Sequence, residues 1–291
     1  MFIAGMDGGG THTRVELRDM ENQLIRRGEF GPFNINSIGE DGFQSLIREV
    51  LCWCGDMSTC ARLCIGGAGV SNPRVKQIME EELSRAGFRG AWKLCGDQEI
   101  ALRGAVDGAG VVVIAGTGSI CFGKNAAGET ARSGGYGHLI DDGGSGYALG
   151  RDVISCAVRA LDGRVTNDRL LRAVCDRLGG GSEQIVPFVY GRETDKAAIA
   201  QFSAIALEQA EQGNPEAKHI LDQGAEELFQ MVFAVQQRLG LGSCRIALLG
   251  GLLEQDNPYR RVVAKKLSAL GEVMPAAHNA LWGAAQMAWE L

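Results

Sequence analysis

The stretch MFIAGMDGGGTHTRVEL, residues 1–17, predicts an apolar strand, a turn rich in glycine and threonine, and a returning strand. The stretch VVVIAGTGSICF, residues 111–122, predicts the same arrangement a second time. Glycine admits positive φ and lets a phosphate approach the backbone, so turns of this kind can present N–H groups to an anion. Two copies in corresponding strand contexts indicate a duplicated fold that holds one phosphate chain between its halves. A nucleotide-using enzyme is therefore the leading interpretation.

The overall composition is that of an ordinary soluble enzyme. With 291 residues, 45% of them hydrophobic, the chain is long enough for two domains of usual size. A net charge of −6 argues against a nucleic-acid partner, which normally meets a basic face. We see no secretory leader and no apolar run that would cross a membrane, which predicts a cytoplasmic protein without a membrane partner. Nine cysteines without a leader predict reduced thiols.

The order of the elements predicts an α/β fold in two domains. Strands are expected at residues 1–6, 13–19 and 24–30, then a helix capped by Asp41, and then alternating strands and helices. The second half repeats the opening strands and then becomes rich in helices, which are expected over residues 145–161, 167–178, 197–212 and 215–239. We place the domains at residues 1–115 and 116–291 with a cleft between them, and the terminal helix 279–291 is a candidate to pack on the first domain.

Asp7 is the first candidate for chemistry. It ends a buried strand, where a carboxylate is costly unless a cation such as Mg²⁺ meets it. The alternative is a turn residue that hydrogen-bonds its own backbone. The turn that follows lacks the lysine and the helix of a P-loop, which excludes that mechanism.

Three further segments are candidates for a site. Gly116-Thr117-Gly118-Ser119 offers hydroxyl and N–H groups that suit a phosphate, although a plain hairpin turn is the alternative. Asp97 follows a strand, where active-site residues of open α/β sheets gather, although a helix cap is equally ordinary for this residue. The glycine-rich loop 134–145 carries two acids ahead of a helix that Ser145 can cap. Loops of this composition bring backbone close to a ligand.

Cysteines and histidines yield no site. The spacing of Cys52, Cys54, Cys60 and Cys64 does not match the paired C-x₂-C of structural zinc, so buried thiols are the better interpretation. His12 and His219 have no recognisable partner, and His138 reads as a core residue.

Together the Asp7–Thr13 hairpin, the Gly116–Ser119 turn, the Gly134–Ser145 loop and Leu248-Leu249-Gly250-Gly251 resemble a known group. They are similar, in order and spacing, to the phosphate 1, phosphate 2, sugar-loop and adenosine segments of the N-acetylglucosamine kinase branch of the BadF/BadG/BcrA/BcrD ATPase family. That family belongs to the actin/hexokinase/Hsp70 superfamily. The resemblance implies two ribonuclease H-like (actin-like ATPase) domains, a sugar as substrate, ATP and Mg²⁺ as cofactors, and a homodimer.

The resemblance also implies roles for single residues. Asp7 would help hold Mg²⁺, and Asp97 would take the proton from the 6-hydroxyl of an amino sugar, most simply N-acetylglucosamine, with glucosamine and N-acetylmuramic acid as further choices. The residues implied to face ATP are Gly8, Gly9, Gly10, Thr11, Thr13, Thr117, Gly118, Ser119, Gly250 and Gly251. The residues implied to contact the sugar are Asn34, Asp97, Thr117, Gly135 and Asp142.

Two positions depart from the pattern of the family. Ile120 stands where kinases of acetylated sugars often carry asparagine, and Gly143 stands where they often carry an acid. The alternative from the same superfamily is a redox-activator ATPase whose dimer holds an iron–sulfur cluster, for which Cys121 and Cys156 have a fitting separation but lack the expected sequence context. A sugar sensor without catalysis is a third possibility, which the presence of Asp7, Asp97 and both phosphate turns disfavours.

Overall fold

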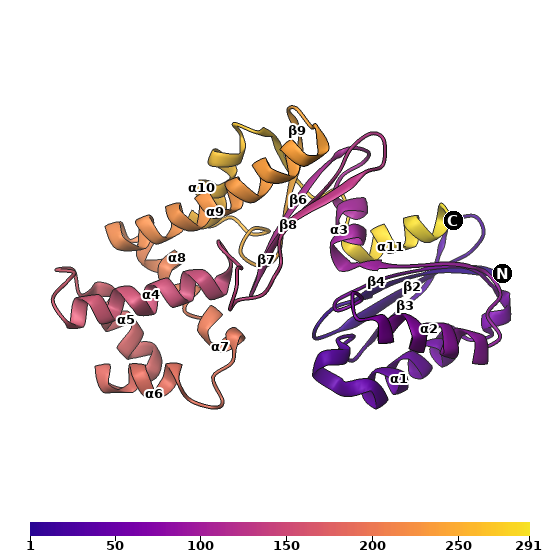
Figure 1. Ribbon diagram of the computed structural model, residues 1–291, viewed down its shortest axis with the longest axis horizontal. Coiled ribbons are helices and arrows are strands. Elements are labelled where there is room, and N and C mark those ends of the chain that lie inside the picture. Colours follow the sequence, from indigo (N-terminus) through magenta and orange to yellow (C-terminus); the bar gives the residue numbers. More distant parts are fainter. The chain divides into compact units, whose positions relative to one another are not determined.

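The computed structural model describes all residues, 1–291, and divides into two compact units (Figure 1). Unit 1 comprises Met1–Gly108 and Ala276–Leu291, and unit 2 comprises Ala109–Pro275. The division falls before the strand at Gly110–Ala115, whereas the sequence placed the boundary after it. The reason is that this strand pairs with two strands of unit 2 and is the centre of that unit's sheet.

Unit 1 is built on a five-stranded sheet in the order β3-β2-β1-β4-β5. The first three strands form an antiparallel meander, and β4 and β5 continue parallel to β1 on its other side. Their bounds are β1 Phe2–Gly8, β2 Thr13–Arg18, β3 Leu24–Phe30, β4 Cys60–Gly67 and β5 Ala91–Gly96.

Unit 2 repeats this topology strand for strand. Its sheet has the order β10-β9-β6-β7-β8, with the meander β6-β7-β8 antiparallel and β9 and β10 parallel to β6. Their bounds are β6 Gly110–Ala115, β7 Ser119–Lys124, β8 Thr130–Gly134, β9 Cys244–Leu249 and β10 Gly271–Pro275. The duplication predicted from the two glycine hairpins is therefore present in the whole sheet, although the sequence did not predict β10.

One face of the unit 1 sheet is covered by α1 (Ile35–Cys54) and α2 (Pro73–Arg85). Their apolar stripes join the strands in one core, which includes Phe43 and Ile47 from α1 and Met79 from α2. Helix α1 begins earlier than the cap expected at Asp41, because the Asn34 side chain already accepts a hydrogen bond from the Asn36 N–H. The helix is interrupted at Gly39, whose φ of 73° is not helical.

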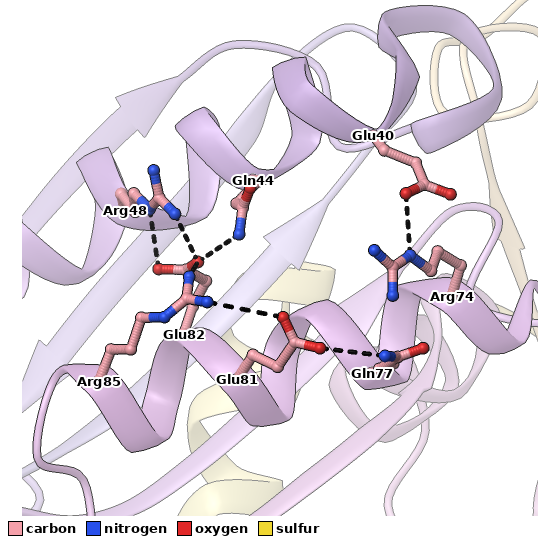
Figure 2. Close-up of polar contacts among 8 residues, drawn as sticks. All are labelled: Glu40, Gln44, Arg48, Arg74, Gln77, Glu81, Glu82 and Arg85. Carbon is pink, nitrogen blue, oxygen red and sulfur yellow. Dashed lines mark hydrogen bonds and ion pairs between the residues drawn. The ribbon is translucent and has the colours of Figure 1, made fainter.

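A buried carboxylate ties these two helices together (Figure 2). Glu82 of α2 is 3% exposed and receives hydrogen bonds from Gln44 and Arg48 of α1, at 2.7 to 3.0 Å, and a further bond from Arg85. These partners lower the pKa of Glu82, first through the Arg48 hydrogen bond. Buried charges persist when they are paired in this way, so the cluster is structural.

The opposite face is covered by α3 (Asp97–Ala105) and the terminal helix α11 (Ala280–Trp289), which lie together in Figure 1. Small residues allow close packing, because a Cβ on Gly5 of β1 would lie 2.4 Å from the Ala285 nitrogen of α11. The backbone of residues 277–278 also donates to the carbonyls of Ala105 and Gly104. The terminal helix thus belongs to unit 1, which was named as a candidate position for it.

Unit 2 owes its larger helical content to a long insertion between β8 and β9. The insertion holds α4 to α9, and α10 lies between β9 and β10. The 197–212 helix expected from sequence is broken into α7 and α8 at residues 201–202, and the short helix α6 was not predicted. No helix in the chain is long and apolar enough to pass through a membrane. The bounds are α4 Gly146–Leu161, α5 Arg169–Leu178, α6 Ile185–Val189, α7 Lys196–Ala200, α8 Ser203–Glu211, α9 Pro215–Leu239 and α10 Pro258–Leu267.

Candidate functional site

In unit 1 the candidate residues gather where three parallel strands end. Asp7 and Gly8 close β1, the turn 67–69 follows β4, and Asp97 follows β5. The register places Asp7 opposite Gly66, and Gly66 opposite Cys95, so the three strand ends are level. Ligands of open α/β sheets bind at the carboxyl ends of the strands, and this edge of the sheet is the position expected for them.

Asp7 lies in an unusual electrostatic setting. The pKa of its carboxyl is raised to about 6, chiefly by burial; the Arg14 guanidinium lowers it and the Asp97 charge adds a smaller rise. Asp7 and Asp97 are therefore within electrostatic reach of one another. Two neighbouring carboxylates, one half-buried and one exposed, are a donor set that suits a hard cation such as Mg²⁺.

Asp97 is the first residue of α3 and not its cap. Gly96 is the N-cap, and the Glu99 side chain completes the cap by accepting from the Gly96 N–H at 3.2 Å. Asp97 is exposed, with one carboxylate oxygen accepting from the Gln98 N–H at 3.0 Å. The surrounding protein raises the pKa of Asp97 and the backbone N–H groups lower it, and its exposure limits the rise. The helix is capped without Asp97, so this carboxylate is free to act on a ligand.

The glycine turn after β1 is open. Gly9 N–H donates to the His12 carbonyl at 2.9 Å, while Gly10 and Thr11 are exposed and a Cβ on Gly10 would meet nothing within 4 Å. Thr13 does not fit the role implied for its hydroxyl. Its side chain is fully buried and donates to the Gly31 carbonyl at 2.7 Å. Thr13 therefore supports the turn from behind.

Asn34 is engaged as the cap of α1, with its side-chain oxygen accepting from the Asn36 N–H at 3.0 Å. It lies next to the turn after β4, where a Cβ on Gly69 would be 3.3 Å from that oxygen. The sequence assigned no role to this turn or to Arg14. The glycine-rich run 66–69, which spans the end of β4 and the turn after it, was the signal that could have marked the turn, whereas Arg14 is placed near Asp7 only by strand pairing.

In unit 2 the Gly116–Ser119 turn is closed by the Gly116 N–H, which donates to the Gly118 carbonyl at 2.9 Å. Thr117 is exposed at its tip. Ser119 is buried, and its hydroxyl donates to the Gly143 carbonyl at 2.7 Å. Ser119 thus joins the turn to the glycine-rich loop, and its hydroxyl is not available to a ligand.

That loop brings Asp142 against the turn. Asp142 is 3% exposed and has φ 64°, a left-handed conformation that is uncommon for a residue other than glycine. Its carboxylate accepts a long hydrogen bond of 3.4 Å from the Ser119 N–H and would lie 3.0 Å from a Cβ on Gly118. Behind it Ser145 caps α4 as predicted, by accepting from the Ala148 N–H at 3.2 Å.

Gly250 and Gly251 lie at the same edge of the unit 2 sheet as the Gly116–Ser119 turn. Gly250 has φ 89°, and a Cβ there would be 2.4 Å from the Ala115 carbonyl oxygen. Gly251 meets nothing within 4 Å. Gly135 lies under Ile120, because a Cβ on Gly135 would be 2.8 Å from the Ile120 Cδ1. Unit 2 therefore collects Thr117, Gly118, Asp142 and the glycine pair, and Ile120 forms an apolar wall beside them.

Comparison with known proteins agrees with this arrangement. The sequence profile of the BadF/BadG/BcrA/BcrD ATPase family matches residues 4–288. An N-acetylmuramic acid/N-acetylglucosamine kinase of Clostridium acetobutylicum is 34% identical over 88% of this chain and 87% of its own length. An N-acetyl-D-glucosamine kinase of Dictyostelium discoideum is 30% identical over 92% of this chain and 90% of its own.

Among solved structures, a proposed N-acetylglucosamine kinase from Chromobacterium violaceum superimposes with a TM-score of 0.78. It is 28% identical in sequence, and the match covers 98% of each chain. The expected fold class, two ribonuclease H-like domains of which the second is enriched in helices, is confirmed by this likeness and by the duplicated sheets.

Proposed function

The chain belongs to the BadF/BadG/BcrA/BcrD ATPase family, and on that premise we propose that it is an ATP-dependent kinase that phosphorylates the 6-hydroxyl of an amino sugar. N-acetylglucosamine is the substrate we place first, because both curated relatives described above are named for it. N-acetylmuramic acid and glucosamine are the other candidates. The observation that carries the proposal is the pair of carboxylates, Asp7 and Asp97, at the edge of the unit 1 sheet.

Phosphoryl transfer needs positioning, neutralisation of charge and a base for the attacking hydroxyl. We assign the base to Asp97, because its carboxylate is exposed at a strand end and its helix is capped by other groups. A nearby negative charge and burial both favour a proton on Asp7, so Asp7 is the better group to hold a cation. Bound Mg²⁺ would neutralise charge on the phosphates of ATP.

The remaining contacts with ATP and the sugar are assigned partly from which residues are exposed. The open turn Gly9–Thr11 and the exposed Thr117 are proposed to meet the phosphates, with the buried Gly8 behind the first turn and Gly118 beside Thr117. Gly250 and Gly251 are proposed to pass the adenosine, and Asp142 and Gly135 to face the sugar with Asn34. Thr13 and Ser119 are proposed to act only by holding the two turns, since their hydroxyls already donate within the protein.

The redox-activator alternative receives no support from the thiols. Cys121 is fully buried in β7 and cannot bridge two subunits through a cluster without opening its sheet. All nine cysteines are unpaired, which fits the reducing cytoplasm that we propose as its compartment. A homodimer is proposed from the resemblance, and light scattering of the purified protein tests it.

A sugar panel tests the proposed activity directly. The protein is supplied with ATP and Mg²⁺ and with N-acetylglucosamine, N-acetylmuramic acid, glucosamine or glucose, while ADP is followed by a coupled assay. We expect ADP release that depends on an amino sugar, and a product with phosphate on the 6-oxygen by phosphorus NMR. ATP hydrolysis that ignores every sugar, in a brown protein absorbing near ~400 nm, would favour the activator instead.

A further inference from the structure

The loop that carries Asp142 is held on one side by the glycine turn of β6 and β7. The Ser119 hydroxyl donates to the Gly143 carbonyl at 2.7 Å, and the Gly146 N–H donates to the Gly116 carbonyl at 2.7 Å. These bonds fix where the loop meets the turn. They leave the other side of the loop to be held by a different part of unit 2.

That other side rests on α9 and α10. The Tyr259 hydroxyl, buried in α10, donates to the Gly144 carbonyl at 2.7 Å. A Cβ on Gly144 would lie 2.5 Å from the Gly224 carbonyl oxygen of α9, so the loop backbone and the helix are in direct contact.

Glu227 of α9 occupies the space beside Gly143. A Cβ on Gly143 would lie 2.9 Å from the Glu227 Oε2, 3.0 Å from its Cγ and 3.1 Å from its Cβ, and these are its three nearest atoms. The backbone of Gly143 has no positive φ, so its conformation alone does not require glycine. A side chain at position 143 would therefore crowd Glu227.

Glu227 also borders an open pocket of about 830 Å³, which lies between α4 and α9 and reaches Gly143 and Gly144. Of the side chains that border this pocket, Glu227 supplies the three atoms nearest to the Gly143 Cβ position. Without Glu227 the loop could relax into the pocket. Asp142 would respond first, because its left-handed backbone persists only while its surroundings enforce it.

We propose that Glu227 is a positioning residue that presses on Gly143 and thereby holds Asp142 in its left-handed conformation against the glycine turn. The inference rests on the proposed function, in which Asp142 contacts the sugar. The Glu227 side chain is exposed and its carboxylate has no hydrogen bond or ion pair, so the effect on Gly143 is assigned to its Cβ and Cγ, which pack against the loop. Its neighbour Glu226 borders the same pocket and pairs with Lys266 at 3.0 Å, but it is not among the nearest contacts of Gly143, so it is the matched control.

The test is a double-mutant cycle of Gly143→Ala and Glu227→Ala, with Glu226→Ala as control. Each variant is assayed for sugar KM, ATP KM and kcat. Each single change is expected to raise sugar KM about threefold to thirtyfold, while ATP KM stays within about twofold. In the double variant the contacts with Oε2 at 2.9 Å and Cγ at 3.0 Å are gone and only the Cβ of residue 227 remains near the added methyl, at 3.1 Å, so Gly143→Ala should cost less in the Glu227→Ala background. Glu227→Gln keeps the packing and should recover most of the lost sugar affinity.

Additive effects of Gly143→Ala and Glu227→Ala on sugar KM would overturn the proposal, and so would Glu227→Gln as impaired as Glu227→Ala. The variant Asp142→Asn, measured alongside, distinguishes the positioning role of Glu227 from the sugar contact of Asp142. If it raises sugar KM but the Glu227 and Gly143 variants do not, the positioning role is wrong and the sugar assignment stands. If Asp142→Asn leaves sugar KM unchanged while ADP release still depends on sugar, Asp142 does not contact the sugar and the positioning role of Glu227 is wrong. The proposed kinase function would still stand.

Discussion

The two glycine hairpins occupy the same place in two sheets of the same topology, yet they carry different chemistry. The last pair of the first hairpin is Gly8 with Thr13, and the last pair of the second is Ala115 with Ser119. Thr13 and Ser119 thus correspond, and each is a buried hydroxyl that donates to a backbone carbonyl beyond the third strand. One pair further from the turn the units differ, because unit 1 has Asp7 opposite Arg14 where unit 2 has Ile114 opposite Ile120.

The difference shows how one topology can carry different side chains in two units. The scaffold positions, meaning the strand order and the buried hydroxyl at the hairpin, are kept in both units. The acids at the strand ends are found in unit 1 only, since Ala276 and Ala277 follow β10 where Asp97 follows β5. Unit 2 instead places a long helical insertion after its meander, and that insertion supports the Asp142 loop. Each unit therefore brings what the other lacks.

The largest effect is expected from the acid that unit 2 lacks. Asp97→Asn should lower kcat by at least ~10²-fold, because a general base contributes about 10²–10⁴-fold to such reactions. ATP binding and thermal stability should remain close to those of the native protein, since Gly96 and Glu99 cap α3 without Asp97. The measurement is steady-state ADP release, with Asp41→Asn on the surface of α1 as the control. Near-normal turnover in Asp97→Asn would show that Asp97 is not the general base.

The second prediction concerns Asp7, whose ionisation lowers the free energy of unfolding. The folded state raises the pKa of Asp7 from 3.8 to about 6, so it favours the neutral carboxyl and is destabilised when Asp7 ionises. This cost is absent below about pH 4, grows as pH rises to about 6, and reaches about 3 kcal/mol above it. Asp7→Asn should therefore stabilise the Mg²⁺-free protein at pH 7 and give no advantage at pH 4, while activity is lost.

The measurement for Asp7 is the midpoint of thermal unfolding at several pH values in the presence of a chelator. The native protein should approach the variant as pH falls, and added Mg²⁺ should stabilise the native protein more than Asp7→Asn. A gap between the two proteins that does not change with pH would contradict the assigned ionisation of Asp7.

The third prediction contrasts two neighbouring glycines of unit 2. Gly250→Ala introduces a Cβ 2.4 Å from the Ala115 carbonyl oxygen at φ 89°, so we expect a loss of stability of roughly 2 kcal/mol or more. Gly251→Ala meets nothing within 4 Å and should leave stability nearly unchanged. Thermal unfolding of both variants checks the pair. Equal losses would show that strand-end packing does not set the glycine requirement.

The smallest effect is expected at Ile120, the counterpart of Arg14 in the hairpin comparison. Its side chain lies over Gly135, and in the proposed site it would offer the sugar a contact surface without a hydrogen bond. We therefore expect selectivity between N-acetylglucosamine and glucose of only about tenfold to a hundredfold in kcat/KM, with glucosamine also accepted. Ile120→Asn, which supplies an amide, should change that ratio by about tenfold. Separation of ~10⁴-fold or more by the native enzyme would mean that recognition lies elsewhere.

Local patterns predicted the strands and caps best. The β-hairpins, the Ser145 cap and the Asn214-Pro215 start of α9 were all predicted, because turn and cap chemistry depends on a few adjacent residues. The start of α1 was predicted too late. Asn34 and Asp41 are both acceptable caps, and in the structure Asn34 is the cap. The break between α7 and α8 also went unpredicted, because no proline or glycine marks it.

For the candidate site residues, the sequence indicated which positions to consider but not which side chains already hydrogen-bond within the protein. Asp7, Asp97 and the glycine turns were proposed from composition, spacing and their place after strands, and the role of Asp142 was implied by the family resemblance. That Thr13 and Ser119 use their hydroxyls inside the protein could not be read from the chain, because their acceptors lie 18 and 24 residues away. The pairing of Arg14 with Asp7 and the contact of Glu227 with Gly143 could not be predicted either, because they arise from strand pairing and from helix packing.

The sequence by itself determined that this protein is a duplicated α/β fold with two glycine hairpins and acids at strand ends, since strand period, turn residues and caps are local properties. Only the tertiary structure decided where the duplication ends, which hydroxyls are buried, and what holds the Asp142 loop. Those outcomes depend on pairs of residues far apart in the chain, brought together by strand pairing and core packing. The burial that raises the pKa of Asp7 is of the same kind, because it arises from the folded surroundings and not from the residue itself.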